Sequence, residues 1–352
     1  MAVTNDLLTD RRVMRHAQAL REEDYDVMLF GRKELKMRMK KSWKFYAEYN
    51  VRLFWRLLRT KCDVVWANDT DTLLGCYMAS CIKRKKLVMD AHELFPEVPE
   101  LVGRERVKHV WEWIERRLMP KCDALLTVCQ SIADYYRQKY GVGMTVVRNI
   151  NEELRMKNEE LTDAANNSSL KMLLYQGCVN KGRGVDWAID ALEFLPHCRL
   201  VVAGWGDLLE EMKSYAAEKP WSDRVEFLGR LMPEELELLT PQASVGLVML
   251  EDMGLSYHFA LPNRIGDFVA AGVPMVVSDL PEMAAVVRRF GIGEVIENGK
   301  TNAEALLEAV KKVLSREWKD SDFTAAREDM DWNKEKEKLI ECVNNLKQKH
   351  IN

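Results

Sequence analysis

The stretch Leu261-Pro-Asn-Arg-Ile-Gly-Asp-Phe-Val-Ala-Ala-Gly-Val-Pro-Met-Val-Val-Ser-Asp-Leu-Pro-Glu282 decides the fold of this chain. It predicts a turn and then a short helix that ends at Gly272, because glycine just past a helix and proline soon after it are common stop signals. The apolar run Met275–Val277 that follows is typical of a parallel strand covered on both faces. The stretch therefore predicts an α/β fold with a parallel sheet.

The start of that helix is the first candidate binding site. Free backbone N–H groups at a helix start attract anions, above all phosphate, and the Arg264 guanidinium adds a fixed positive fork. The Asp267 carboxylate, one turn further on, can accept hydrogen bonds from sugar or ribose hydroxyls. Together with Pro262 and Asn263, these residues predict a site for a nucleotide diphosphate that carries a sugar.

A second phosphate-type turn lies upstream, between the strand pattern Lys171–Tyr175 and the amphipathic helix Val185–Phe194. It reads Gln176-Gly-Cys-Val-Asn-Lys-Gly-Arg-Gly184. Glycines let the backbone approach a phosphate closely, and Arg or Lys neutralises its charge. The spacing is neither a Walker A loop nor GxGxxG, but both turns follow strands, where open α/β sheets bind ligands. The candidates for binding the donor are Gly177, Lys181, Gly182 and Arg183.

With these motifs the chain resembles the retaining glycosyltransferases of family 4, which have the GT-B fold, over nearly its whole length. The family's Gly-x5-Lys-Gly turn reads Gly177-x5-Arg183-Gly184 here. The chain is similar to the bacterial polysaccharide-type subgroup that has Leu-Pro-Asn-Lys/Arg in place of Glu-x7-Glu. Two further segments match the family's middle strands and add Gly204 and Arg230 to the donor site: Ala203-Gly-Trp-Gly-Asp207 and Val225-Glu-Phe-Leu-Gly-Arg230.

Three positions depart from the family's pattern. Cys178 stands where Arg often follows the first glycine, and Phe259 stands where the first Glu of Glu-x7-Glu would fall. The loop Asn5–Arg12 lacks the family's usual pair of glycines. We therefore expect some contacts to the donor phosphates to differ from those of the family.

The resemblance implies two doubly wound, Rossmann-like domains that face each other across a cleft. We expect an acceptor-binding domain over residues 1–150 together with a C-terminal helix at about 332–352. A linker is expected over 151–169 and a nucleotide-sugar domain over 170–331. Because only Met1–Val3 precede Thr4, the first central strand is expected to be short or clipped.

The alternation of apolar strands and amphipathic helices supports this organisation. In the first domain we expect strands at Val27–Phe30, Val64–Ala67, Leu87–Asp90, Ala124–Val128 and Met144–Val147. In the second we expect them at Met172–Tyr175, Arg199–Ala203, Val225–Leu228, Val245–Val248, Met275–Val277 and Gly293–Ile296. Expected helices of the first domain include Thr9–Arg21, Thr70–Ile82, Arg106–Leu118 and Ser131–Tyr140.

The segment Asp90-Ala-His-Glu-Leu-Phe-Pro-Glu97 matches the part of the family that carries its active-site histidine. The resemblance implies that His92 contacts the transferred sugar and steadies the transition state, where a neutral imidazole can donate or accept a hydrogen bond. Glu93 and Glu97 are candidates for acceptor hydroxyls, with solvated loop carboxylates as the alternative. Asn5, Asp6 and Asp10 are candidates for the cleft, with helix capping as the alternative for Asp10.

The mechanism implied is transfer of a hexose from a nucleotide-diphosphate sugar to a glycan or lipid-linked acceptor, with retention and with no metal or cofactor. Helix starts and Arg side chains would stabilise the departing diphosphate by electrostatic catalysis. Two alternatives stay open. One is a GT-B epimerase that needs no acceptor, and the other is a non-catalytic, nucleotide-sugar-binding partner of another transferase.

Charge is unevenly distributed along the chain. Residues 1–150 carry 28 Lys and Arg against 20 Asp and Glu, while the whole chain has a net charge of −3. Arg32–Lys61 holds 11 basic and two acidic residues with aromatics between them. This pattern predicts an anionic membrane surface as a partner, at about 1 kcal/mol per cation, with a solvated helix whose aromatics pack inward as the alternative. No nucleic-acid motif accompanies it.

We expect a cytoplasmic protein that is peripheral on the inner face of the cell membrane. The eight cysteines form no CxxC pair and no zinc pattern, which is typical of buried thiols in a reducing compartment. No apolar run approaches 18 residues, so we expect no membrane span. The role expected is surface polysaccharide synthesis. The sequence indicates no oligomeric state, sugar or base.

Overall fold

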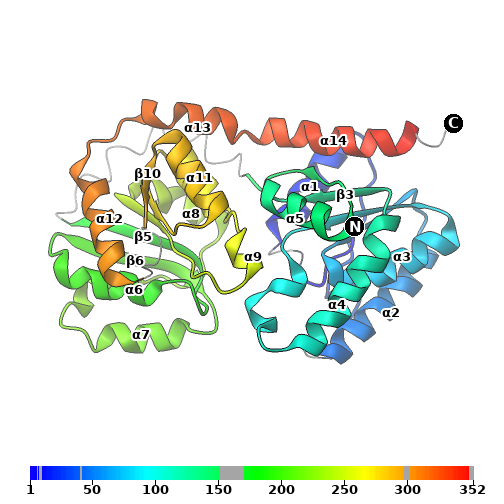
Figure 1. Cartoon of the computed structure of the whole chain (residues 1–352), viewed down its shortest axis with the longest axis horizontal. Coiled ribbons are helices and arrows are strands. Elements are labelled where there is room, and N and C mark those ends of the chain that lie inside the picture. The colour runs from blue at the N-terminus through cyan, green and yellow to red at the C-terminus, as the bar shows by residue number, and fades with distance from the viewer. Residues whose placement is uncertain (6, 8–9, 40–41, 151–169, 297–301, 349–352) are drawn as a thin grey trace. The chain divides into compact units, whose positions relative to one another are not determined.

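The computed structural model, drawn in Figure 1, describes residues 1–5, 7, 10–39, 42–150, 170–296 and 302–348. The chain divides into two compact units. The first comprises Met1–Asn149, Gly254–Ser256 and Asn333–Asn352, and the second comprises Ile150–Met253 and Tyr257–Trp332. The linker expected over 151–169 and the candidate Asp6 lie outside the described residues.

The first unit contains a four-stranded parallel sheet in the order β1-β2-β3-β4. The strands are β1 (Val64–Asn68), β2 (Lys86–Ala91), β3 (Ala124–Thr127) and β4 (Thr145–Val146). Ala2 adds isolated parallel bridges to Phe30 and to Ala67 of β1. The order of the chain across the sheet therefore reverses at Ala2, because both of its neighbours come later in the chain. In open α/β sheets, ligands bind at the carboxyl ends of the strands beside such a reversal.

One predicted strand is wrong. Val27–Phe30 forms no strand. Phe30 bridges Ala2, donating its N–H to Met1 O at 2.9 Å and accepting from Val3 N at 3.1 Å, and the Met1 amino group donates to Met28 O at 2.7 Å. One isolated bridge, between Ala2 and Phe30, is too little pairing to make a strand of this segment. The other four strands predicted for this part of the chain are confirmed within two residues at either end.

In the described residues, six α-helices accompany this sheet, and α14 comes from the C-terminal part of the chain. α1 begins two residues later than predicted, because the Asp10 carboxylate caps it by accepting from Val13 N at 3.1 Å. α14 is fixed by its buried Glu335, which pairs with Arg148 at 2.8 Å. None of the helices in the described part of the chain is long and apolar enough to cross a membrane. The six are α1 (Arg11–Glu22), α2 (Trp43–Arg59), α3 (Thr70–Lys83), α4 (Glu105–Leu118), α5 (Gln130–Tyr140) and α14 (Trp332–Gln348).

The second unit contains a six-stranded parallel sheet in the order β10-β9-β8-β5-β6-β7. Because β5 comes first in the chain and pairs with both β6 and β8, the order reverses at β5. All six strands were predicted, with boundaries within three residues. They are β5 (Lys171–Cys178), β6 (Cys198–Trp205), β7 (Val225–Phe227), β8 (Val245–Val248), β9 (Met275–Val277) and β10 (Gly293–Val295).

The core of this unit has two apolar clusters, and β5 contributes to both. Leu173 and Tyr175 belong to one cluster, while Met172 and Leu174 belong to the other. Side chains alternate between the faces of a strand, so the sheet is buried on both faces, as its apolar strands predicted. Figure 1 shows α6 (Val185–Ala191) beside α12 (Ala303–Ser315), and these two helices pack together.

The stretch that decided the fold is confirmed element by element. α10 spans Arg264–Ala271 with Asn263 at its N-cap, and Gly272 ends it with a φ of +68°. β9 follows at the predicted residues. The predicted helix Val185–Phe194 is shorter than expected, because α6 tightens into a 3-10 turn at Leu192–Phe194.

Candidate functional site

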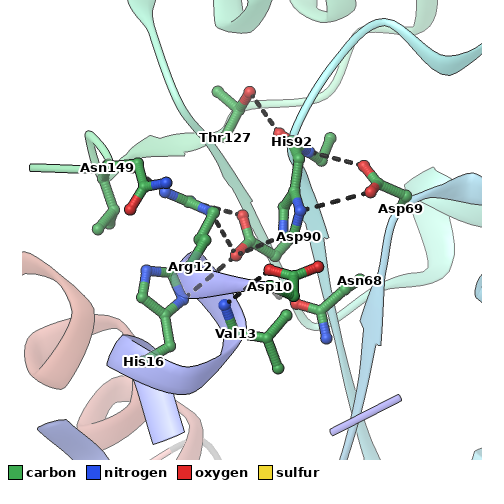
Figure 2. Close-up of polar contacts among 12 residues, drawn as sticks. Asp10, Arg12, Val13, His16, Asn68, Asp69, Asp90, His92, Thr127 and Asn149 are labelled. Atoms are coloured by element: carbon green, nitrogen blue, oxygen red, sulfur yellow. Dashed lines mark hydrogen bonds and ion pairs between the residues drawn. The ribbon is translucent and has the colours of Figure 1, made fainter. Parts of the chain in front are cut away.

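A buried carboxylate organises the strand ends of the first unit (Figure 2). Asp90, fully buried near the end of β2, accepts two hydrogen bonds from Arg12 of α1, from Nε at 2.9 Å and from Nη2 at 2.7 Å. His16 Nδ1, one turn along α1, lies 3.2 Å from Asp90 Oδ2. A third Arg12 nitrogen, Nη1, donates to Val147 O at 2.6 Å. The bidentate geometry fixes α1 against the sheet.

His92 lies between two carboxylates in the same place. Its Nε2 is 3.5 Å from Asp90 Oδ2, and its Nδ1 is 3.4 Å from Asp69 Oδ2. Its backbone N–H donates to Asp69 Oδ1 at 2.8 Å. Figure 2 shows His92 with Asp69 on one side and Asp90 on the other. Both ring nitrogens therefore face acidic oxygens.

These contacts set the charges. Burial would raise the pKa of Asp90, but the Arg12 guanidinium and the His92 ring hold it well below its usual range. Burial would lower the pKa of His92, but Asp69 and Asp90 raise it to about 9, while burial raises the pKa of Asp69 to about 8, so this pair holds at least one proton at neutral pH. Burial lowers the pKa of His16 to about 4, so that ring stays neutral.

Asp69 holds an unusual backbone conformation at the N-cap of α3. Its φ of 59° and ψ of 167° fall in a region that only glycine enters easily, at a cost of about 1–3 kcal/mol. The conformation is fixed by its N–H, which donates to Asp90 O at 2.9 Å. The strained residue thus aims its carboxylate at His92, and such strain is concentrated at functional sites.

The other candidates of this unit have ordinary partners. Asn5 donates to Asp10 Oδ2 at 3.4 Å, and Asp10 caps α1, which was its structural alternative. Glu97 accepts from Lys108 Nζ at 2.8 Å and so is not a freely solvated carboxylate. Glu93 is exposed in the loop directly after His92.

In the second unit, Arg264 lies where the strand order reverses. It is 6% exposed, and its Nη1 donates to Gln176 O of β5 at 2.8 Å. Nη2 lies 3.5 Å from Met249 O, just past β8, and the guanidinium stacks over Tyr175 with 4.8 Å between Cζ and the ring centroid. Its Nε has no hydrogen-bond partner within the described ranges. The predicted cation is therefore at the strand ends, held by backbone carbonyls.

A polar chain continues from there. Gln176 Nε2 donates to Asp267 Oδ2 at 2.9 Å, and Thr240 Oγ1 donates to Gln176 Oε1 at 3.1 Å. Gly177 has a φ of +128°, and a side chain on Gly204 would collide with its carbonyl. Glycine is thus required at both positions, which keeps the ends of β5 and β6 close together. Asp267 is bound to a side chain and is buried.

The remaining donor candidates are not part of this hydrogen-bonded chain. Arg183 donates from Nε to Tyr257 OH at 3.1 Å, and the Arg230 guanidinium lies 4.7 Å from the Trp205 ring centroid. Lys181 is exposed. Gly182 has a φ of +73° and packs against Met253. Pro262 and Asn263 directly precede α10, with Asn263 as its N-cap, and Pro262 O accepts from Ile265 N.

The residues of these networks that were not among the candidates include Arg12, His16, Asp69, Asp90, Gln176 and Thr240. A signal existed for three of them, since Asp69 directly follows β1, Asp90 lies near the end of β2 and Gln176 lies near the end of β5. Arg12 and His16 read as ordinary helix residues. Within the described residues, no group of three His, Cys, Asp or Glu side chains is arranged to hold a metal ion.

Solved structures share this fold at low sequence identity. A sucrose-phosphate synthase from Thermosynechococcus elongatus has a TM-score of 0.77 and 15% identity, over 95% of this chain and 92% of that chain. Anabaena HepE in complex with UDP and glucose has a TM-score of 0.73 and 14% identity, over 98% of each chain. WaaG, a glycosyltransferase involved in lipopolysaccharide biosynthesis, has a TM-score of 0.65 and 16% identity, over 95% and 93%.

Family models match both halves of the sequence. Residues 9–150 match the Glycosyltransferase Family 4 model, and residues 156–338 match the model of Glycosyl transferases group 1. No curated protein matches the chain significantly. Because the second model covers more than half of the chain and the fold is that of GT-B enzymes, the protein belongs to the glycosyl transferases group 1 family and is a glycosyltransferase.

Proposed function

We propose that the protein transfers a hexose from a nucleotide-diphosphate sugar to a glycan or lipid-linked acceptor in surface polysaccharide synthesis. The observation that carries this proposal is Arg264, a buried cation at the carboxyl ends of β5 and β8. These strands flank the reversal of the sheet, where open α/β sheets bind ligands. The family match favours a transferase over an epimerase or a non-catalytic partner.

The proposed reaction proceeds with retention and needs no metal or cofactor. The bond between the sugar C1 and the diphosphate oxygen breaks, and the acceptor oxygen bonds to C1 on the same face. The acceptor hydroxyl proton passes to the departing diphosphate. Arg264 stabilises the charge that develops on the diphosphate, together with Arg183 and Lys181 of the glycine-rich turn after β5.

His92 is proposed to serve the transferred sugar through the charges that it organises. The Asp90 carboxylate stays ionised, and the His92 ring lies between it and Asp69. Because these polar groups are fixed before the sugar arrives, they can stabilise it in the transition state without reorganising. His92 therefore acts as a contact to the sugar and as the group that holds the two carboxylates in place.

Donor binding is tested first, by thermal shift with UDP-, GDP-, ADP- and TDP-sugars. HepE was solved with UDP-glucose, so UDP-sugars are the first to try. A ligand at 100 times its Kd stabilises the protein by about 2.7 kcal/mol. The best donor is then incubated with purified protein and a glycan acceptor, and the product's anomeric configuration is read by proton NMR. Inversion would overturn the retaining mechanism.

The same incubation separates the alternatives. An epimerised donor formed without acceptor would establish the isomerase. Donor binding without turnover, restored by adding another transferase, would establish the binding partner. Transfer by the purified protein alone supports the proposal.

We propose that the acceptor is met at an anionic membrane surface through α2. Trp43, Val51 and Trp55 recur along one face of this helix at multiples of four residues, and they are 75%, 59% and 51% exposed. Lys44 lies 5.7 Å from the Trp43 ring and Arg59 lies 5.6 Å from the Trp55 ring. Exposed tryptophans beside cations suit the interface of an anionic bilayer. The other aromatics of the segment that are fully buried, Phe45 and Tyr49, serve the core.

Vesicle flotation tests this surface. The wild type is expected to float with anionic vesicles in low salt and to be released by high salt. Replacement of Trp43 and Trp55 by Ser, or of Lys40, Lys41 and Lys44 by Glu, should abolish flotation; residues 40 and 41 lie outside the described part of the chain. Phe194→Ser, at an equally exposed aromatic of the second unit, is the control. Equal flotation on neutral vesicles, or none on either kind, would make α2 an ordinary solvated helix.

A further inference from the structure

A cationic cavity of about 510 Å³ lies in the first unit, outside the Asp90 network. Its volume is in the range of small-molecule sites. Its walls come from the chain start, the loop after Phe30 and the first turn of α2. The lining residues that matter here are Thr4, Asn5, Arg32, Lys33, Lys36 and Phe45.

The cavity lies at the carboxyl end of the sheet. Thr4 and Asn5 follow the bridge residue Ala2, and Arg32 follows its partner Phe30. The Arg32 N–H donates to Asn5 O at 3.3 Å, which ties the two walls together. This is the edge, beside the reversal of strand order, where open α/β sheets bind ligands.

The cavity also adjoins the His92 site within the same unit. The Thr4 hydroxyl donates to Asp71 Oδ2 at 2.6 Å in the first turn of α3. Asp69, the N-cap of the same helix, accepts from the His92 N–H. Two hydrogen bonds and one helical turn therefore link the cavity wall to His92, so a molecule in the cavity would lie close to the proposed sugar site.

The charged side chains that line the cavity are all positive among the described residues. Arg32, Lys33 and Lys36 line it, and among the described residues no carboxylate does. Glu34 of the same loop is turned to the backbone, where it accepts from Gly31 N at 2.9 Å. The Arg32 guanidinium is fixed 5.3 Å from the Phe45 ring centroid. In the described part of the chain neither Arg32 nor Lys36 has a carboxylate partner, so their charge is available to an anion.

We propose that this cavity binds the phosphate group of a phosphate monoester acceptor. The Arg32 guanidinium fork beside the Lys36 ammonium group matches the charge and the oxygens of a phosphate monoester. The Thr4 and Asn5 side chains supply polar contacts to the alcohol that carries the phosphate. The role as an acceptor site rests on the proposed transfer function, whereas phosphate binding does not.

Calorimetry on the full chain tests binding with glycerol 3-phosphate, inorganic phosphate and glycerol. Both phosphates are expected to bind and glycerol is not. The double variant Arg32→Gln, Lys36→Gln should weaken glycerol 3-phosphate by about 100-fold, the loss of two charged hydrogen bonds. Arg104→Gln, Arg106→Gln removes the same charge from exposed sites on the same unit and should change nothing. Equal affinity in wild type and the Arg32, Lys36 variant would overturn the proposal.

Vesicles distinguish the source of the phosphate. Phosphatidic acid in phosphatidylcholine presents the same phosphate monoester on a lipid. A larger loss of vesicle binding in the Arg32, Lys36 variant than in the Arg104, Arg106 control, reversed by glycerol 3-phosphate, assigns the cavity to a lipid-borne acceptor. Equal losses, with glycerol 3-phosphate still bound by the wild type only, assign it to a soluble one.

The two proposals fail separately. If the wild type binds glycerol 3-phosphate through Arg32 and Lys36 but transfers no sugar, the transfer function is wrong and the cavity stands. If it transfers sugar but binds no phosphate, the cavity assignment is wrong and the transfer function stands.

Discussion

The strand ends of the two units hold their charges in opposite ways. In the first unit, Asp90 is satisfied by Arg12 and faces two histidines, so opposite charges are buried together and balance one another. In the second unit, Arg264 bonds only to backbone carbonyls, and no carboxylate lies within ion-pair distance of it among the described residues. A balanced cluster gains rigidity, whereas an unbalanced cation keeps its charge for a ligand.

This difference suits the two units to different proposed roles. The first unit can hold a neutral or weakly cationic sugar in a fixed potential, because its own charges are settled before a substrate arrives. The second can bind a diphosphate, because burial makes an unpaired cation a strong anion site. Substitutions in the first unit should therefore cost stability or catalysis, and substitutions in the second should cost donor affinity.

The largest effect is expected from Asp90→Asn. It leaves the buried Arg12 without its charged partner, and breaking such a pair costs about 3–5 kcal/mol of unfolding free energy. Urea unfolding measures the loss. Asp63→Asn is the control, because the Asp63–Lys85 pair has the same kind of contact at 2.9 Å but is exposed, and such pairs contribute about 0–1 kcal/mol. Equal losses in both variants would remove the contrast between the units.

His92→Ala is expected to act on catalysis with little effect on donor binding. If His92 serves the transition state, kcat falls by about 10²-fold, the size of one preorganised electrostatic contact, while the donor Kd stays level. Steady-state kinetics and calorimetry on the same preparation give both numbers. A normal kcat in a folded variant would leave His92 a structural residue between Asp69 and Asp90.

Arg264→Ala should reverse that pattern. The donor is expected to bind more weakly, with a loss of about 1.5–3 kcal/mol of binding free energy for each charged hydrogen bond lost to the diphosphate. Arg264→Lys should recover only part of this binding free energy if the contact is bidentate. Arg199→Ala is the matched control, because Arg199 belongs to the same sheet near the opposite, amino-terminal end of β6. Donor affinity like that of the wild type in Arg264→Ala would show that the cation only holds β5 and β8 together.

Local signals explain what the sequence predicted well. Gly272 and Pro274 marked the end of α10, and the apolar run after them is β9, so both elements were predicted at their observed residues. The donor candidates followed from the same signals, since glycines and cations at strand ends are visible in a linear pattern. Val27–Phe30 failed because pairing depends on a partner that periodicity does not show.

The charge network of the first unit depended on contacts that no linear pattern contains. Arg12 and Asp90 are separated by 78 positions, and His16 gains its role only because α1 packs against the end of β2. The raised pKa of His92 was likewise not predicted, since it arises from Asp69 and Asp90, and the Asp69 carboxylate is held by a strained backbone. The sequence pattern identified His92 as a candidate, while the packing of Asp69 and Asp90 around it raises its pKa.

The smallest effect expected is a pH dependence of stability that belongs to His92. Its pKa is raised to about 9 in the folded protein, against about 6.5 when unfolded, so the folded state binds the proton more tightly. The stabilisation is therefore complete below about pH 6.5 and is lost as pH rises through about 9. Because the ring is partly exposed and solvent screens it, we expect about 1 kcal/mol. The difference in unfolding free energy between the wild type and His92→Gln should shrink by this amount from pH 6.5 to 9.5. A constant difference would mean that the ring is neutral throughout, and the balanced charges of the first unit would then reduce to Arg12 and Asp90.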